Sequence, residues 1–175
     1  MDLVKTLLNG MTSDSSIEAL KGKSGASSSQ IESAVKSAIP SLIGSMTKNA
    51  SSEDGAKSLL GALSQHKNTD SLSSQIKNAD ELDGAKILGK ILGGNKDDFL
   101  KEIAKSSGLD IGQTNSVLSS IAPAILSSLS AATASEDEKK ADLSSVGGFF
   151  KSIFGDDDKK DDMGSLVDIL KKTIL

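Results

Sequence analysis

Residues 24–54 read SGASSSQIESAVKSAIPSLIGSMTKNASSED, and residues 107–137 read SGLDIGQTNSVLSSIAPAILSSLSAATASED. The two stretches align without a gap at an offset of 83 residues, which is the separation of Pro40 and Pro123. High serine content explains some of the identities, but the shared Gly, Gln and Pro positions and the closing Ser-Glu-Asp are not all serine. The sequence therefore predicts two diverged copies of one unit.

Each copy opens with a helix-start signal. Ser27 stands three residues before Gln30, and Asp110 stands three before Gln113, which is the spacing of a capping box. Apolar residues then recur at helical spacing, so each copy predicts a long core helix. These residues are Ile31, Ala34, Val35, Ala38, Ile39, Leu42, Ile43 and Met46 in the first copy, and Val117, Leu118, Ile121, Ala122, Ile125, Leu126 and Leu129 in the second.

Proline and glycine punctuate these helices. Pro40 and Pro123 fall inside the apolar stripes, where proline lacks the N–H of one helical hydrogen bond, so we expect a kink or a restart that serves packing. Gly93-Gly94 is expected to stop a helix, and Gly108 to end another in the left-handed conformation. These five residues are the predicted structural positions.

Further helices fill the spaces between the copies. One spans Met1 to Met11, and one opens at Ser51 or Ser52. Asp80 and Asn95 are the expected N-caps of two further helices. The expected buried residues are Leu59, Leu60 and Leu63; Leu82, Ile87, Leu88, Ile91 and Leu92; and Phe99, Leu100, Ile103 and Ala104. Because no segment alternates apolar and polar residues, we expect an all-α, compact helical bundle built from two diverged copies of one helical unit.

The last part of the chain differs in composition. We expect residues 1–134 to form the helical domain and residues 135–175 to form a charged linker and tail with short amphipathic helices. Phe149, Phe150, Ile153 and Phe154 would share one helix face, which either docks on the protein's own core or binds a partner. A protein partner is preferred to a membrane surface, because anionic lipid would repel the acidic run at 156–162.

Composition excludes several classes of function. The 175 residues include no Cys, Trp or Tyr, the 20 basic residues are all Lys, and the net charge is −4. Arginine forks and stacking aromatics are the usual means of reading nucleic acid, so we expect no nucleic-acid partner. The lack of cysteine fits a reducing compartment, and the N-terminus lacks a signal-peptide pattern, so we expect a soluble, cytoplasmic protein. No integral membrane association is expected either, because no run of about 18 apolar residues is present.

The residues that carry chemistry are sparse. His66 is the single histidine and is interpreted as a solvated surface residue. No serine lies in a nucleophile elbow, and the glycines at 84, 89, 93 and 94 suit close helix packing better than a phosphate loop. The aspartates at 156–162 lack the calcium-loop spacing and suit a linker. We therefore expect no catalytic, metal or cofactor site.

Three segments together resemble a known family. They are residues 83–94 (DGAKILGKILGG), residues 107–109 (SGL) and residues 121–126 (IAPAIL), in that order. This pattern is similar to the YidB-like family of bacterial proteins, domain of unknown function number 937, over roughly residues 1–129. The resemblance implies an all-α fold with a duplicated helical unit, and it implies no activity or catalytic residue.

These observations favour a non-enzymatic helical scaffold or protein-interaction module. Duplicated amphipathic helices without a catalytic constellation suit self-association or binding of a protein partner. The alternative is a carrier of a small apolar ligand or lipid, held in a cavity between the two long helices.

Overall fold

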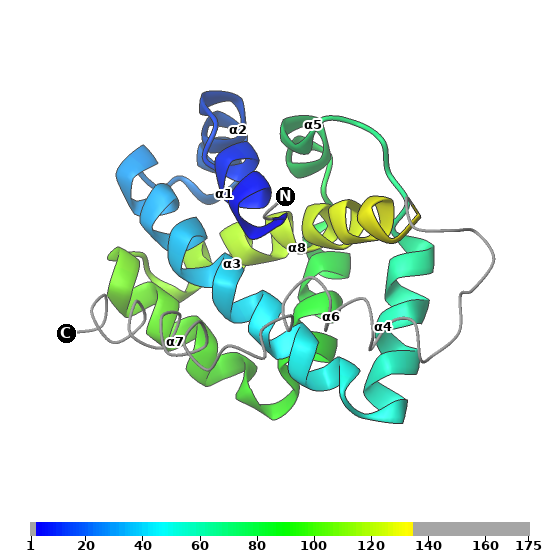
Figure 1. Ribbon diagram of the computed structural model, residues 1–175. Coiled ribbons are helices and arrows are strands. Elements are labelled where there is room, and N and C mark those ends of the chain that lie inside the picture. Colours follow the sequence, from blue (N-terminus) through cyan, green and yellow to red (C-terminus); the bar gives the residue numbers. More distant parts are fainter. Residues whose placement is uncertain (1–2, 135–175) are drawn as a thin grey trace, which may run out of the picture.

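The structure is a computed structural model that describes residues 3–134, and over these residues the chain is all-α (Figure 1). No strand occurs among them, which confirms the predicted all-α class. The helices are α1 (Leu3–Met11), α2 (Asp14–Ser24), α3 (Ser28–Ala50), α4 (Glu53–Gln65), α5 (Leu72–Lys77), α6 (Glu81–Leu92), α7 (Lys96–Ser107) and α8 (Ile111–Ala134), with a 3₁₀ turn at Gly93–Asn95. Helices α2 and α5 were not predicted from the sequence.

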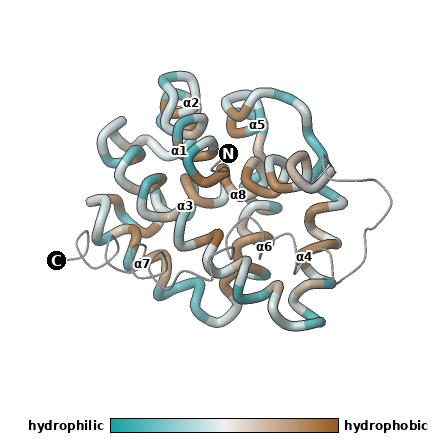
Figure 2. The backbone as a smooth tube through the Cα atoms, in the orientation of Figure 1, coloured by the Kyte–Doolittle hydropathy of each residue, from teal (hydrophilic) through white to brown (hydrophobic). Residues whose placement is uncertain are grey.

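Helix α8 lies at the centre of the bundle. Every other α-helix packs against it, and in the view of Figure 1 α1, α2 and α5 lie above it while α6 and α7 lie below. Apolar segments of the surrounding helices gather around it in Figure 2. No residue from Ile111 to Ala134 is charged, so no face of this helix requires water. Its fully buried apolar residues are Val117, Leu118, Ile121, Ala122, Ala124, Ile125, Leu126 and Leu129.

The same helix meets the length and composition of a membrane span. The window Ile111–Ala132 has a mean hydropathy of 1.2, and 67% of it is buried inside the bundle. No such segment was expected from the sequence, because no run of about 18 apolar residues is present. Burial of most of its residues gives a central helix of a helical bundle the same composition, so length and hydropathy alone do not distinguish the two settings.

Both predicted capping boxes are confirmed. The Ser27 side chain accepts a hydrogen bond from the Gln30 backbone N–H, and the Gln30 side chain accepts one from the Ser27 backbone N–H. In α8, Asp110 Oδ1 accepts from the Gln113 backbone N–H at 2.7 Å, and Gln113 Oε1 accepts from the Asp110 backbone N–H at 3.2 Å. These reciprocal bonds satisfy amides that a helix start otherwise leaves unpaired.

A left-handed glycine precedes each of these caps. Gly25 has a φ of 68° after α2, and Gly108 has a φ of 74° after α7. The backbone N–H of each glycine bonds to the carbonyl four residues earlier, which closes the preceding helix. The predicted role of Gly108 is therefore confirmed.

The prolines do not divide the long helices. Pro40 lies inside the continuous α3, and Pro123 lies inside the continuous α8, so neither helix restarts, and the alternative of a kink stays a prediction. Proline removes one backbone hydrogen bond, but the flanking residues of each helix are anchored in the core and hold the helical path.

Gly93-Gly94 ends α6 as predicted, although it does not stop the helical chain. Gly93 has a φ of 56°, and the 3₁₀ turn Gly93–Asn95 leads directly into α7. Asn95 precedes α7, but its side chain makes no capping bond, so this part of the prediction is wrong. With φ −91° and ψ 2°, its backbone already follows the turn and lacks the extended conformation that a capping side chain uses.

Helix α6 approaches α8 closely at Gly84. A Cβ atom added to Gly84 would fall 1.7 Å from the carbonyl oxygen of Ser119. That oxygen has no helical partner four residues later, because Pro123 lacks an N–H, and it is free to accept a weak Cα–H contact from Gly84. Close packing therefore explains Gly84, whereas a Cβ added to Gly89 would meet no atom within 4 Å.

The prediction that Leu82 is buried is wrong, since its residue is 76% exposed. It precedes Gly84 by two residues, and at about 100° per residue this places it roughly opposite the face that α6 turns toward α8. Ile87, Leu88, Ile91 and Leu92 occupy the buried face as predicted. Leu60 and Phe99, two further residues expected in the core, are only partly buried.

Candidate interaction grooves

Two helix pairs, α2–α3 and α7–α8, contact each other through reciprocal hydrogen bonds. Ser33 Oγ donates to the backbone carbonyl of Ser106 at 3.5 Å, and Ser116 Oγ lies 3.4 Å from that of Lys23, sharing its one proton with the nearer Glu81 Oε2 at 3.0 Å. Ser33 and Ser116 are 83 residues apart, as are Lys23 and Ser106. Each long helix therefore contacts, near its beginning, the end of the short helix of the other pair.

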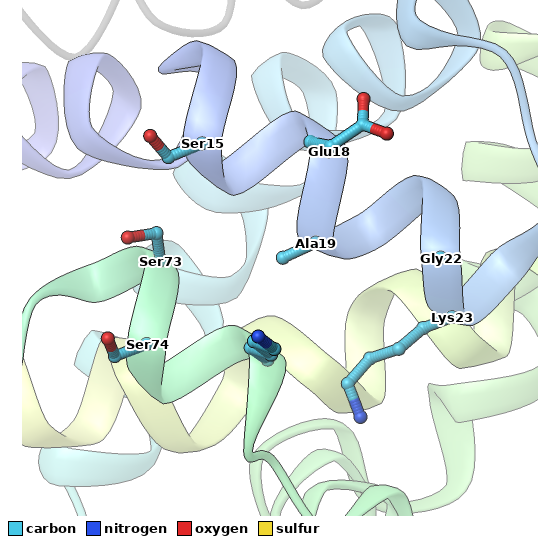
Figure 3. A pocket seen from close by; sticks show the side chains of 8 residues that line it. Ser15, Glu18, Ala19, Gly22, Lys23, Ser73 and Ser74 are labelled. Carbon is cyan, nitrogen blue, oxygen red and sulfur yellow. The ribbon is translucent and has the colours of Figure 1, made fainter.

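A groove opens between α2 and α5, which we call the α2–α5 groove (Figure 3). It encloses about 520 Å³ and is lined by Ser15, Glu18, Ala19, Gly22, Lys23, Ser73, Ser74 and Lys77. Figure 3 shows Ala19 directed from α2 toward α5, whereas Glu18 points away from α5. The small side chains on this side of α2 leave the space open.

The charged groups of the α2–α5 groove are largely engaged elsewhere. Lys23 Nζ donates to the backbone carbonyl of Ala79 at 2.9 Å and lies 4.0 Å from a Glu81 carboxylate oxygen. Glu18 pairs with Lys21 at 3.1 Å. The groove thus offers mainly hydroxyl groups, which gives it little chemical selectivity.

A second groove, which we call the α3–α6–α7 groove, lies between these three helices. It encloses about 300 Å³ and is lined by Ser45, Lys48, Asn49, Ile91, Leu92, Asn95, Asp98, Phe99 and Glu102. Ile91, Leu92 and Phe99 supply apolar surface, while Lys48, Asp98 and Glu102 are exposed. Apolar surface with charged residues beside it suits an amphipathic segment of a protein chain.

Asn49 fixes one wall of the α3–α6–α7 groove. Its Nδ2 donates to the backbone carbonyl of Ile91 at 2.6 Å and to that of Lys90 at 3.3 Å. These carbonyls belong to the last turn of α6, which lacks helical partners for them. A side chain of α3 therefore caps α6 and holds the two helices together at the groove.

His66 lies in an ordered environment, not in solvent as the sequence analysis expected. Its side chain is 15% exposed, with Nε2 2.7 Å from Asp83 Oδ2 and Nδ1 2.7 Å from the backbone carbonyl of Ala62. Both neighbours are hydrogen-bond acceptors, so both ring nitrogens face groups of the protein itself. Asp83 follows His66 by 17 residues, a separation that carries no sequence signal.

Two large apolar side chains are exposed where α6 and α8 begin. Leu82 is 76% exposed and Ile111 is 47% exposed. The two helices meet nearby, since Ser116 Oγ donates to Glu81 Oε2 at 3.0 Å. Single exposed apolar residues are common on protein surfaces, so these two do not define a site.

The other predicted site residues are distributed as follows. Phe149, Phe150, Ile153 and Phe154 lie outside the described residues. Gly93 and Gly94 adjoin the α3–α6–α7 groove through Leu92 and Asn95, and the Gly108 carbonyl accepts from Gln30 Nε2 at 2.6 Å. Pro40 and Pro123 line neither groove. Among residues 3–134, no three His, Asp or Glu side chains gather where they could hold a metal ion.

The sequence of the chain also matches a known protein family. A model of bacterial proteins of unknown function, DUF937, matches residues 6–132. The chain belongs to this family. Neither a curated protein nor a solved structure matches the chain. The match spans the helices from α1 to α8, and membership of a family of unknown function brings no activity with it.

Proposed function

We propose that this DUF937 protein is a non-enzymatic protein-interaction module, in which the helical domain carries a binding segment at residues 149–154. The main support comes from the distribution of Phe. The buried apolar residues among 3–134 are all aliphatic or methionine, and Phe99 is only partly buried. The other three Phe stand close together at 149, 150 and 154, outside the described residues. Clustered aromatic side chains are suited to binding another protein.

We further infer that α1–α3 and α6–α8 are two diverged copies of one unit. The 83-residue offset aligns Gly25 with Gly108, and both glycines are left-handed. The same offset aligns the two capping boxes, the two prolines and the reciprocal hydrogen bonds between the pairs. Duplication of one helical unit is typical of scaffolds that present related surfaces.

The chemistry of the described residues agrees with a non-enzymatic role. Both nitrogens of the single histidine face acceptors inside the protein. The carrier alternative gains no support from the two grooves, since both open at the surface and neither lies between the facing stripes of α3 and α8. Interaction through the tail is therefore the hypothesis that we favour.

The test uses the full chain with four substitutions, Phe149→Ala, Phe150→Ala, Ile153→Ala and Phe154→Ala. The matched control changes three aspartates of the same tail, Asp156→Asn, Asp157→Asn and Asp158→Asn. Light scattering and proximity labelling in a bacterium that expresses the protein are measured for both. We expect the alanine variant to lose self-association or its enriched neighbours, and the control to keep them.

Two outcomes would contradict the proposal. One is a monomeric unchanged protein without neighbours enriched above background. The other is an alanine variant that keeps every association of the unchanged chain. Circular dichroism of each variant would verify that the helical domain stays folded.

A further inference from the structure

At the 83-residue offset, the helices that border the α3–α6–α7 groove correspond to the helices against which α5 packs. Helix α5 packs against α2, α8 and α1. At the 83-residue offset, α2 corresponds to α7, α8 to α3, and α1 to the end of α6. These three counterparts are the helices that border the α3–α6–α7 groove. The correspondence rests on the duplication inferred above.

Individual residues support this correspondence. A Cβ added to Gly10 of α1 would fall 2.4 Å from Leu72 Cδ1 of α5, so α5 covers that glycine. Gly93 follows 83 residues later, and a Cβ added there would meet no atom within 4 Å among the described residues. Likewise, Ser15 and Ala19 line the α2 side facing α5, and the residues at the same offset, Asp98 and Glu102, line the α3–α6–α7 groove.

Helix α5 shows which length and apolar spacing a segment needs to bind at such a position. It is a helix of six residues, and its apolar residues Leu72 and Ile76 are four positions apart. Ile76 is fully buried, and Leu72 packs partly buried against the core. A segment that fits the second groove therefore needs apolar residues four positions apart within a short helix.

The tail contains a segment of this pattern. Phe149 and Ile153 are four residues apart, as are Phe150 and Phe154. This segment follows α8, and it directly precedes residues 155–160, which lie 83 positions after α5; α5 itself follows α3 with α4 between them. Lys151 lies between the apolar pairs, and the groove presents two carboxylates, Asp98 and Glu102, against one ammonium group, that of Lys48. We propose that the α3–α6–α7 groove binds the Phe149–Phe154 segment of the same chain.

The intervening chain is long enough for this contact. Residues 135–148 separate α8 from Phe149, and when extended they span about 50 Å. A domain of this size has a radius of gyration of about 14 Å, so a linker of this length reaches most of its surface. Docking in the same chain would hold the proposed binding segment on its own domain, and a partner would have to compete with the groove for it.

The absence of cysteine from the 175 residues allows a direct test by disulfide trapping in the full chain. One variant carries Asp98→Cys with Lys151→Cys, and the other carries Lys77→Cys with Lys151→Cys. Both domain positions are exposed residues that line a groove, the first in the α3–α6–α7 groove and the second in the α2–α5 groove. Under mild oxidation of dilute protein, we expect the Asp98→Cys pair to form an intrachain disulfide severalfold faster.

A filled groove provides a second measurement. Glu102→Trp, added to the Asp98→Cys and Lys151→Cys variant, should slow disulfide formation severalfold because the ring occupies the groove. Lys101→Trp is the matched control, since Lys101 is exposed on α7 but does not line the groove. It should leave the rate unchanged.

Three results would overturn the docking proposal: equal trapping rates for the two cysteine pairs, disulfides formed only between chains, or no difference between Glu102→Trp and Lys101→Trp. Each of these results concerns the groove alone. The interaction proposal would fail separately, through light scattering and proximity labelling, so the two failures are distinguishable.

Discussion

The long helices α3 and α8 begin in the same way and lie in different surroundings. Both start with a capping box, both follow a left-handed glycine, and both continue through a proline. However, α3 exposes Glu32, Lys36 and Lys48 along one side, whereas α8 is charge-free and packs against every other α-helix. The capping box and the preceding glycine thus determine where each helix starts, whereas the presence or absence of charged side chains decides whether it lies at the surface or at the centre.

This difference also decides which contacts each helix makes. The α8 backbone is approached by α6 at Gly84, a contact that needs glycine. Near its end, α3 uses the Asn49 side chain to cap α6, and the residue 83 positions later in α8 is Ala132, which cannot donate such a bond. Substitutions in α3, in α8 or in the neighbouring α6 should therefore have unequal effects on stability, and the largest is expected where α6 contacts α8.

The largest effect is expected for Gly84→Ala. A Cβ at this position would fall 1.7 Å from the Ser119 carbonyl oxygen, so α6 must move away from the central helix. We expect the free energy of unfolding to fall by about 3 kcal/mol or more, at the upper end of overpacking effects. Urea unfolding followed by circular dichroism measures this change.

Gly89→Ala is the matched control on the same helix, since a Cβ there meets no atom within 4 Å. It should stabilise the protein by roughly 0.5–1 kcal/mol, because alanine favours a helix over glycine. Equal effects of the two substitutions would show that α6 does not depend on close contact with α8.

The sequence could predict most features that depend on neighbours along the chain. The capping boxes, the left-handed Gly108 and the apolar faces of α3 and α8 follow from short-range spacing. The absence of charge across Ile111–Ala134 is a further sequence signal for the burial of most of α8. Helix α5, with six residues, is too short for a recognisable period.

Other features depend on residues that are distant in sequence. Leu82 was counted among the apolar residues expected to be buried in α6, and only the position of α8 determines that it faces outward. The contact of His66 with Asp83 and that of Asn49 with Ile91 join different helices, so no local spacing predicts them. The α3–α6–α7 groove also requires the packed arrangement of three helices.

The second-largest effect is expected for Asn49→Ala, which makes this part of α3 resemble α8. Loss of the bonds to the Ile91 and Lys90 carbonyls should lower the free energy of unfolding by about 1–2 kcal/mol. Asn49→Asp keeps the size of the side chain but removes its donors, so it should destabilise at least as much. Thermal unfolding measures both, and an Asp variant as stable as the unchanged protein would argue against the cap.

A smaller loss of stability is expected when either capping box is disrupted, and the two losses should differ. Asp110→Ala and Ser27→Ala should each lower the free energy of unfolding by about 1 kcal/mol. The effect should be larger at Asp110, whose carboxylate accepts at 2.7 Å, than at Ser27, whose hydroxyl accepts at 3.4 Å. Ser27→Asp should then stabilise α3 slightly, and urea unfolding of the three variants tests this order. A larger loss at Ser27 would contradict it.

The smallest effects concern the reciprocal bonds between the helix pairs. Ser33→Ala removes one long contact of 3.5 Å, so we expect a loss within about 0.5 kcal/mol. Ser116→Ala removes a similar contact and also the 3.0 Å bond to Glu81, so its loss should be greater, at about 1 kcal/mol. In a double-mutant cycle with Glu81→Ala, which removes the acceptor, most of the excess should disappear, because the excess belongs to the Glu81 bond. If Ser116→Ala still cost more than Ser33→Ala in the Glu81→Ala background, the central position of α8, and not this added bond, would account for the difference between the two helices.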